Sequence, residues 1–435
     1  MSVALFRSVR EYARERTRPR PPHGVRGRWL RLPGVPGPLF RRRPESALSL
    51  LSDAFPRNLP DEAFAGLLDG EIENVVLLVV DGFGLGQWTR LRSELRLLES
   101  FERDGTVTPL TSTYPSETAA AITTLHTGLL PAEHGLLGWN QYLDSIDESI
   151  QTLPYSLQDG TPVRDEYPLA NPRELFEGDA IYGDAEGQGI DTHVTQPQHI
   201  AGSISSELTT AGAETHGYWN VADMAVTLRD VVADGDEPTH VTAYVPNVDS
   251  ISHVTGTETA RYDAQVRMVT EAIRTGFLEE LDPDTAERTA FLVTADHGHT
   301  NVEQSAAVDL SVPAVQDCLE RDADDEAIPP QGGPRNVQFH VADGRVGTLR
   351  EYLEEKAGED VLLFTETEYR ERGLFGSNHA EPGETFDRRA PDLLAVHRQS
   401  PMWHEADDKI GVHGGMTPAE MIVPFAAARA SDLQS

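Results

Sequence analysis

This chain of 435 residues contains a single cysteine, Cys318. One cysteine excludes a disulfide within the chain and any metal site built mainly from thiolates. Lysine is nearly as scarce and occurs at Lys356 and Lys409. Long apolar runs are missing as well, since the longest aliphatic stretch, VVLLVV at 75–80, is far too short to span a bilayer. The N-terminal region lacks the apolar stretch of an export signal, so we expect a cytoplasmic protein.

The charge balance indicates the expected environment and partners. The formal net charge is −35, from 71 acidic and 36 basic residues. Hydrated carboxylates keep a protein soluble in high salt, where their mutual repulsion is screened, so this composition favours a halophilic protein over an ordinary acidic one. A broad nucleic-acid surface is excluded, because it would need a basic footprint. The length suffices for one large domain with insertions.

The N-terminus is the exception to this acidity. Residues 1–43 contain twelve arginines and only two acids, Glu11 and Glu15. Together with the Pro- and Gly-rich stretches PRPPHGVRG and LPGVPGPLF, this predicts a mostly disordered arm over residues 1–45, followed by a catalytic domain over 46–435. The arm could contact an anionic membrane or RNA, or fold back on the acidic body. An unstructured tail or a misplaced start codon is the alternative.

Strand and helix patterns alternate through most of the chain. A fully buried parallel strand is expected at Asn74–Val80, with further strands at 106–110, 214–219, 240–247 and within ERTAFLVTADHGH at 287–299. Helices are expected at 86–102, 198–211, 222–232 and 259–281. This alternation predicts an α/β fold with a mostly parallel central sheet covered by helices on both faces. Residues 141–190 and 300–387 are irregular and are interpreted as inserted cap segments, and 391–398 resembles one more strand.

Carboxylates and histidines recur at predicted strand ends and in the loops near them. Open α/β sheets bind ligands at the carboxyl ends of their strands. Each residue alone has an ordinary explanation, such as a turn, a helix cap or a surface histidine. Together they offer two sets of about three ligands, which suit a pair of Zn²⁺ or Mn²⁺ ions better than Ca²⁺ or Mg²⁺. The candidates are Asp81, Thr118, Asp249, His253, Asp296, His297 and His413.

Thr118 is the candidate nucleophile. It precedes the run AAAITTL, with Pro115 upstream and the Thr127-Gly128 break downstream, so it is expected where a helix begins. The positive end of that helix would stabilise an alkoxide and a phosphoryl group bound against it. A plain helix N-cap is the alternative, and Ser116 keeps a serine nucleophile open.

Five motifs occur together in order: VVDGFG, YPSETAAAITTLHTGLLPAEHGLLGWN, PNVDSISHVTG, VTADHGH and VHGGMTPAEMIVP. In order and spacing they resemble the alkaline phosphatase superfamily, and more narrowly its type I phosphodiesterase/nucleotide pyrophosphatase branch. The resemblance covers about residues 74–140 and 190–425. It implies an alkaline phosphatase-like fold and metal-dependent hydrolysis of phosphodiester or pyrophosphate bonds in a small-molecule substrate.

The resemblance also implies roles for single residues. One metal ion, zinc or alternatively manganese, would be held by Asp249, His253 and His413. The other would be held by Asp81, Asp296, His297 and the oxygen of Thr118. Attack by Thr118 on phosphorus would give a phospho-threonine intermediate.

The match departs from the family near the nucleophile. The asparagine expected three positions after it is Ala121 here. Asn140 is the candidate for holding a nonbridging phosphate oxygen, displaced by one residue. Arg335 could contact a substrate anion or form a structural salt bridge. An aromatic clamp for a nucleotide base could use Phe83, Trp139 or Tyr142. The alternative is that these side chains serve only ordinary packing.

Other functions remain open at this stage. A phosphomonoesterase or phosphonate hydrolase could use the same scaffold, since the metal site alone does not fix the leaving group. A catalytically silent, metal-binding member is a third possibility. The sequence disfavours a sulfatase, because PSETAAA has neither the modified cysteine nor a nearby arginine. The sequence gives no sign of the oligomeric state.

Overall fold

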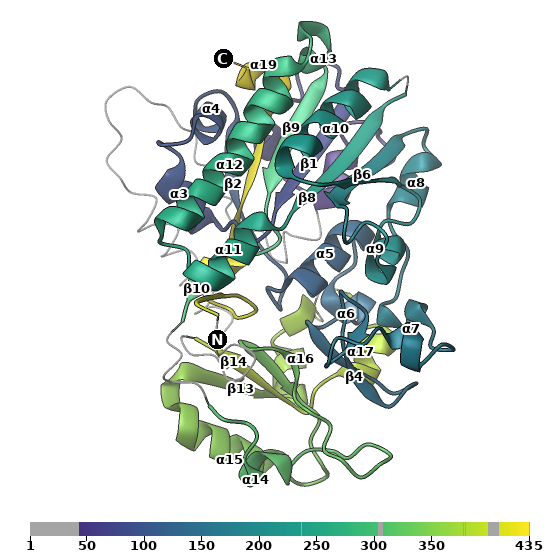
Figure 1. Cartoon of the computed structure of the whole chain (residues 1–435), viewed down its shortest axis with the longest axis vertical. Coiled ribbons are helices and arrows are strands. Elements are labelled where there is room, and N and C mark those ends of the chain that lie inside the picture. Colours follow the sequence, from purple (N-terminus) through teal and green to yellow (C-terminus); the bar gives the residue numbers. More distant parts are fainter. Residues whose placement is uncertain are drawn as a thin grey trace.

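The computed structural model describes residues 43–235, 237–302, 308–376, 378, 380–398 and 409–434. A central sheet with its helices occupies one end of the elongated molecule, and a second sheet occupies the other (Figure 1). Most of the arm expected at 1–45 lies outside the described residues, and its last three positions belong to helix α2 (Arg43–Leu48). None of the helices in these ranges has the length and apolarity that a membrane crossing requires.

The central sheet has seven strands and is mostly parallel, which confirms the predicted fold class. Every neighbouring pair is parallel except the two pairs formed by the C-terminal strand. In spatial order the strands are β2 (Thr106–Thr111), β16 (Ile422–Arg429), β9 (Thr289–Thr294), β1 (Asn74–Val80), β8 (Thr239–Val245), β6 (Asp191–Pro197) and β7 (Glu214–Tyr218).

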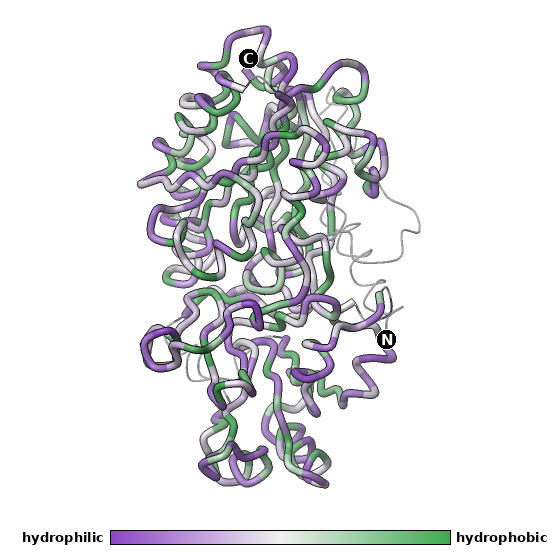
Figure 2. Tube along the Cα trace, turned by 90° about the vertical axis from the view of Figure 1, so that its right-hand side faces the viewer, coloured by the Kyte–Doolittle hydropathy of each residue, from purple (hydrophilic) through white to green (hydrophobic). Residues whose placement is uncertain are grey.

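Strand β1 is the centre of this sheet, and all seven of its residues are buried. Its unbroken Val/Leu run suits a strand that is covered on both faces. Helices α10 (Val221–Asp234) and α12 (Ala260–Gly276) lie side by side over one face (Figure 1). Their buried residues, such as Leu228 and Ile273, join the β-strands in one apolar cluster. Figure 2 shows these apolar stretches running through the interior, with polar segments toward the periphery.

Several predicted boundaries were wrong. The helix expected at 86–102 is two helices, α3 (Leu85–Leu91) and α4 (Arg96–Asp104), because the chain turns at 92–95 and Leu95 is extended. The helix expected at 198–211 is only α9 (Ile204–Thr209). Strands β6 and β16 were missed. Strand β16 contains Pro424 and an alanine run, which carry little β propensity, and its burial between β2 and β9 overrides that preference.

The second sheet is antiparallel and also has seven strands. It draws strands from both segments interpreted as insertions and from the strand expected at 391–398. The pair Gly332 and Asn140 joins the two segments. In spatial order its strands are β13 (Val361–Thr365), β14 (Leu393–His397), β12 (Asn336–Phe339), β11 (Gln331–Gly333), β3 (Asn140–Leu143), β4 (Glu148–Gln151) and β5 (Ser156–Leu157).

Shorter elements complete the described chain. The helices are α5 (Thr118–Thr127), α6 (Pro131–His134), α7 (Val163–Glu166), α8 (Tyr182–Glu186), α11 (Asn247–Thr255), α13 (Pro283–Glu287), α14 (Pro313–Gln316), α15 (Val346–Ala357), α16 (Glu366–Glu371), α17 (Glu384–Arg389), α18 (Pro418–Met421) and α19 (Ala430–Leu433). A two-stranded ribbon pairs β10 (Thr300–Asn301) with β15 (Gly411–Val412).

A buried ion pair connects the second sheet to the segment that enters β16. Arg335, beside β12, is fully buried, and its Nε and Nη2 donate to the two carboxylate oxygens of Glu420 at 2.5 and 2.9 Å. Glu420 also accepts from the backbone N–H of Gly415 at 2.9 Å. Of the two roles considered for Arg335, the structure therefore supports the structural salt bridge.

We expect Arg335→Met to lower the free energy of unfolding by about 3–5 kcal/mol, because Glu420 would stay buried without its cation. Urea unfolding in multimolar KCl measures the change. The matched control is Arg173→Met, which removes an exposed pair with Asp179 and should cost less than about 1 kcal/mol. Equal losses in the two variants would contradict the role of the buried pair.

Candidate active site

Three aspartates meet at one edge of the central sheet because their strands are neighbours. Strands β9, β1 and β8 lie side by side and parallel. Asp81 directly follows β1, Asp296 follows β9, and Asp249 lies in α11 just beyond β8. The other predicted ligands reach the same edge. Around these aspartates the structure brings together all seven sequence candidates: Asp81, Thr118, Asp249, His253, Asp296, His297 and His413.

One half of the cluster surrounds His297. Its Nε2 lies 3.1 Å from Thr118 Oγ1, 3.3 Å from Asp296 Oδ2 and 3.4 Å from Asp81 Oδ1. Its Nδ1 faces the carbonyl oxygen of Gly298 at 3.2 Å, which places the proton on Nδ1 and leaves the Nε2 lone pair toward the cluster. This half contains three mutually close ligand groups, Asp81, Asp296 and His297.

Thr118 is the first residue of α5, as the sequence predicted. The N-cap is Glu117, whose side chain makes no cap hydrogen bond, and the helix ends at Gly128 with a φ of 72°. The Thr118 hydroxyl faces His297 Nε2 instead of capping a backbone N–H. Ser116 is fully buried, and its hydroxyl donates to the carbonyl of Gly415 at 2.8 Å. The Thr118 hydroxyl therefore faces the cluster, whereas the Ser116 hydroxyl is bonded to the backbone of Gly415.

The other half of the cluster surrounds Asp249. Helix α11 presents Asp249 and His253 on one face, since they are four residues apart. The Nε2 atoms of His253 and His413 lie 3.4 and 3.6 Å from Asp249 Oδ1. Each ring donates from Nδ1 to a backbone carbonyl, His253 to Gly411 at 2.7 Å and His413 to Ser116 at 3.2 Å. These bonds leave both Nε2 lone pairs facing the carboxylate.

His299 was missed by the sequence analysis although it stands two residues after His297. It is buried, its Nε2 lies 2.7 Å from Asp249 Oδ1, and its Nδ1 lies 2.7 Å from Ser252 Oγ. Ser252 can donate to Nδ1, and Nε2–H then donates to Asp249.

Position 82 requires glycine, because its φ is 71° and a Cβ there would lie 2.8 Å from the His299 ring. The signal that could have found His299 was the second histidine of ADHGH.

The carboxylates carry an unfavourable charge arrangement. Burial raises the pKa of Asp81 well above its usual value, and the neighbouring Asp296 and Asp249 raise it further. Asp81 Oδ1 and Asp296 Oδ2 are buried without a hydrogen-bond partner. Burial would also raise the pKa of Asp249, but the surrounding histidines, first His253, outweigh it and hold that pKa well below its usual value. A cation between these oxygens would relieve the repulsion.

Burial disfavours the charged form of three histidines in the cluster, His253, His297 and His413. Burial lowers the pKa of His253 to about 4 and lowers the pKa of His413 well below its usual value. Burial also lowers the pKa of His297. Neutral imidazoles beside unpaired carboxylate oxygens form a donor set that fits divalent ions such as Zn²⁺. The residues present therefore fit the metal pair that the sequence motifs imply.

Two further groups adjoin the cluster and were not foreseen. The Tyr244 hydroxyl donates to Asp81 Oδ2 and orients that carboxylate. Glu117 is buried next to Thr118, and burial raises its pKa to about 8, against the opposing effects of the Trp139 N–H and of Lys409. Gly414 packs on Glu117 with a φ of 108°, where a Cβ would come within 2.7 Å of Oε1.

Asn140 and the candidate aromatic clamp lie in different surroundings. Asn140 begins β3; its Oδ1 accepts from Gln158 at 3.0 Å and its Nδ2 donates to Gly332 at 3.4 Å. Its contact with a phosphate oxygen stays a prediction. Phe83 is buried in the core beside Trp88. Trp139 is exposed, and its backbone N–H donates to Glu117 at 2.9 Å.

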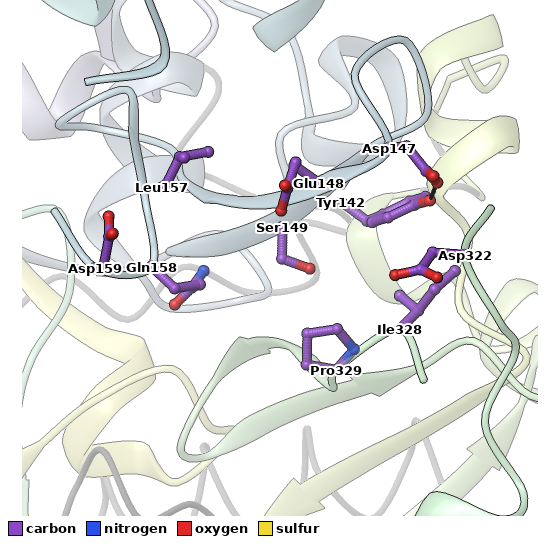
Figure 3. Close-up of a pocket in the computed structure, with 10 residues that line it drawn as sticks. All are labelled: Tyr142, Asp147, Glu148, Ser149, Leu157, Gln158, Asp159, Asp322, Ile328 and Pro329. Atoms are coloured by element: carbon purple, nitrogen blue, oxygen red, sulfur yellow. Dashed lines mark hydrogen bonds between the residues drawn. The ribbon is translucent and has the colours of Figure 1, made fainter. Parts of the chain in front are cut away.

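A pocket of about 350 Å³ opens on the second sheet, beside strands β3 to β5 (Figure 3). Tyr142 lies on its wall with its hydroxyl bonded to Asp147. Four carboxylates line the pocket, so it would repel a phosphate anion. It is therefore not the phosphate site. The carboxylates are those of Asp147, Glu148, Asp159 and Asp322.

His299→Ala should weaken zinc binding about 10- to 100-fold, because Asp249 would lose the hydrogen bond that orients it. Equilibrium dialysis of the chelated protein against Zn²⁺ measures the change. His299→Gln keeps a side-chain N–H donor and should recover part of the affinity. An affinity in His299→Ala equal to that of the parent protein would remove His299 from the site.

The chain is similar to a known family and to several solved structures. The family model "Type I phosphodiesterase / nucleotide pyrophosphatase" matches residues 75–415. Murine ectonucleotide pyrophosphatase/phosphodiesterase 5 has a similar structure, with a TM-score of 0.60 and 16% identity, covering 83% of this chain and 92% of that one. An inactive variant of the murine protein in complex with AMP gives the same values.

The human counterpart aligns with a TM-score of 0.59 at 14% identity, over 83% of this chain and 92% of that one. No curated protein sequence matches the chain. At these identities the solved structures establish the fold, and the family model covers most of the described catalytic core. The chain therefore belongs to the type I phosphodiesterase/nucleotide pyrophosphatase family and is a hydrolase of that type.

Proposed function

We propose that the protein hydrolyses phosphodiester or pyrophosphate bonds of a small molecule, with Thr118 as nucleophile at a two-metal site. The observation that carries this proposal is the position of the Thr118 hydroxyl. Its Oγ1 faces His297 Nε2 at 3.1 Å, and the same nitrogen is bordered by the unpaired oxygens of Asp81 and Asp296. A nucleophile, a helix N-terminus and a carboxylate–imidazole ligand set thus meet at one point.

Each group of the chain has a role in this proposal. Asp249, His253 and His413 would hold one divalent ion, and Asp81, Asp296, His297 and the Thr118 oxygen would hold the other. When bound, the ions lower the pKa of the Thr118 hydroxyl and neutralise charge on the phosphate. Zinc is the ion we infer, with manganese as the alternative.

The covalent step takes place on Thr118. Its hydroxyl loses its proton, Oγ forms a bond to phosphorus, and the bond from phosphorus to the leaving oxygen breaks. The result is a phospho-threonine whose phosphorus keeps the substrate's other substituent, and the leaving group departs with a proton. The N-terminus of α5 stabilises the negative charge on the transferred group. Water then cleaves the Thr118 ester, so that one P–O bond is hydrolysed and the threonine is regenerated.

The distribution of basic groups favours a diester over a monoester. A monoester carries a second negative charge, and a cationic clamp would offset it. Arg335 is unsuited to that task because it is buried and its guanidinium is already paired with the Glu420 carboxylate. Among the described residues, Lys409 is close enough to act electrostatically on both Glu117 and His253.

The family and the site surroundings support a nucleotide-like substrate class. The murine relative is inactive when a threonine is replaced by alanine, and that form is seen with AMP. This supports a nucleotide-like substrate here, with exposed Trp139 beside Glu117 as a surface for stacking a base. The excess of acidic residues and the scarcity of lysine support the proposal that the enzyme acts in a salt-rich cytoplasm.

Thr118→Ala should reduce turnover to background while the protein stays folded, because no other hydroxyl occupies that position. Thr118→Ser keeps a hydroxyl at the start of α5 and should retain measurable activity. Steady-state rates, with circular dichroism as the folding control, test both variants. A Thr118→Ala variant with the parent rate would eliminate Thr118 from the mechanism.

Leaving-group preference is tested with bis(p-nitrophenyl) phosphate against p-nitrophenyl phosphate. The assay uses chelated protein resupplied with Zn²⁺ or Mn²⁺ in multimolar KCl. We expect metal-dependent hydrolysis that favours the diester. A preference for the monoester would identify a phosphatase instead, and no activity on either substrate with two ions bound would favour a silent metal-binding protein or a narrow specificity.

A further inference from the structure

Two histidines and a carboxylate meet on the central sheet, away from the strand ends that form the catalytic cluster. Strands β6 and β7 are parallel, and their register places His193 opposite Glu214 and Thr195 opposite His216. Side chains alternate between the faces of a strand, so His193, Glu214 and His216 share one face. Their ligand atoms all lie within 4.8 Å of one another.

The spacing of these atoms is close to that of a metal site. His193 Nδ1 lies 3.0 Å from His216 Nε2. Two imidazole nitrogens on one tetrahedral Zn²⁺ would be about 3.3 Å apart, given Zn–N bonds of about 2.0–2.1 Å. The Glu214 carboxylate oxygens lie 3.8 Å from His216 Nε2 and 4.0 Å from His193 Nδ1. Its side chain is largely exposed and can rotate to close that gap.

A second carboxylate prepares His193 for metal binding. Asp191, two residues earlier on β6, places Oδ2 at 3.1 Å from His193 Nε2. That contact holds the proton on Nε2, so Nδ1 presents its lone pair toward His216 and Glu214. A carboxylate behind a ligating imidazole is the usual support of a zinc-bound histidine.

We propose that His193, Glu214 and His216 bind one divalent transition-metal ion of the zinc class, in addition to the catalytic pair. Two nitrogens and one carboxylate oxygen leave a fourth tetrahedral position for water. Among the described residues, strand β7 lies at one edge of the central sheet and pairs with β6 alone. The ion would bridge β6 and β7 and hold this edge strand in place.

The proposal is tested by counting zinc in the full-length protein. Protein stripped with chelator is dialysed against Zn²⁺, and bound zinc per chain is measured by elemental analysis. His216→Ala should bind one ion fewer than the parent. His199→Ala, which removes an exposed histidine from the loop after β6, is the matched control and should bind as many ions as the parent.

The comparison of the parent with His216→Ala is repeated with Asp249→Asn added to each protein, so that the zinc count does not depend on the catalytic pair. The difference of one ion should persist. Asp191→Asn, which keeps the shape of the side chain, should weaken binding of this ion about 10- to 100-fold. Equal zinc counts in the parent and in folded His216→Ala would overturn the proposal, and would show that the two histidines share only a hydrogen bond. If His216→Ala does not fold, an unchanged affinity in Asp191→Asn overturns it equally.

Discussion

The crowding of Asp81, Asp249 and Asp296 at three neighbouring strand ends is the constraint on which the site depends. Parallel strands β9, β1 and β8 deliver these carboxylates to one buried edge. Burial and mutual repulsion push the pKa of Asp81 up, while three histidines draw the pKa of Asp249 down. A protein that keeps unpaired carboxylate oxygens inside needs cations there, and the proposed metal pair supplies them.

The rest of the structure holds the remaining ligands against that edge. Strand β2 runs toward it and is followed by the segment that ends in Thr118, while the ribbon of β10 and β15 presents His413. The second sheet closes the other side, with Trp139 bonded to Glu117. Arg335 and Glu420 fasten this sheet to the chain entering β16. The site is thus built from segments that are far apart in sequence.

Local patterns were enough to predict the central elements. The run NVVLLVV gave the bounds of β1, and a hydroxyl residue before an alanine run located the start of α5 at Thr118. Strand-end positions marked Asp81 and Asp296 because parallel strands share their carboxyl edge. Each of these inferences needs only neighbouring residues and one general rule about sheets.

Features that arise from long-range pairing could not be predicted in this way. The second sheet joins short strands from separated segments, and no single strand signals its partner. The contact of His193 with His216 depends on the register of β6 and β7. The positions of Tyr244 and Glu117 beside the cluster depend on the tertiary structure. His299, in contrast, could have been predicted from the spacing of the histidines in ADHGH.

The most direct test of the two-metal account is anomalous X-ray scattering at the zinc edge, from crystals of the full chain grown with Zn²⁺. The account predicts two peaks about 3.5–4 Å apart at the carboxyl edge of the central sheet. One should lie among Asp81, Asp296, His297 and Thr118, and the other among Asp249, His253 and His413. A single peak at that edge, or none, would contradict the account.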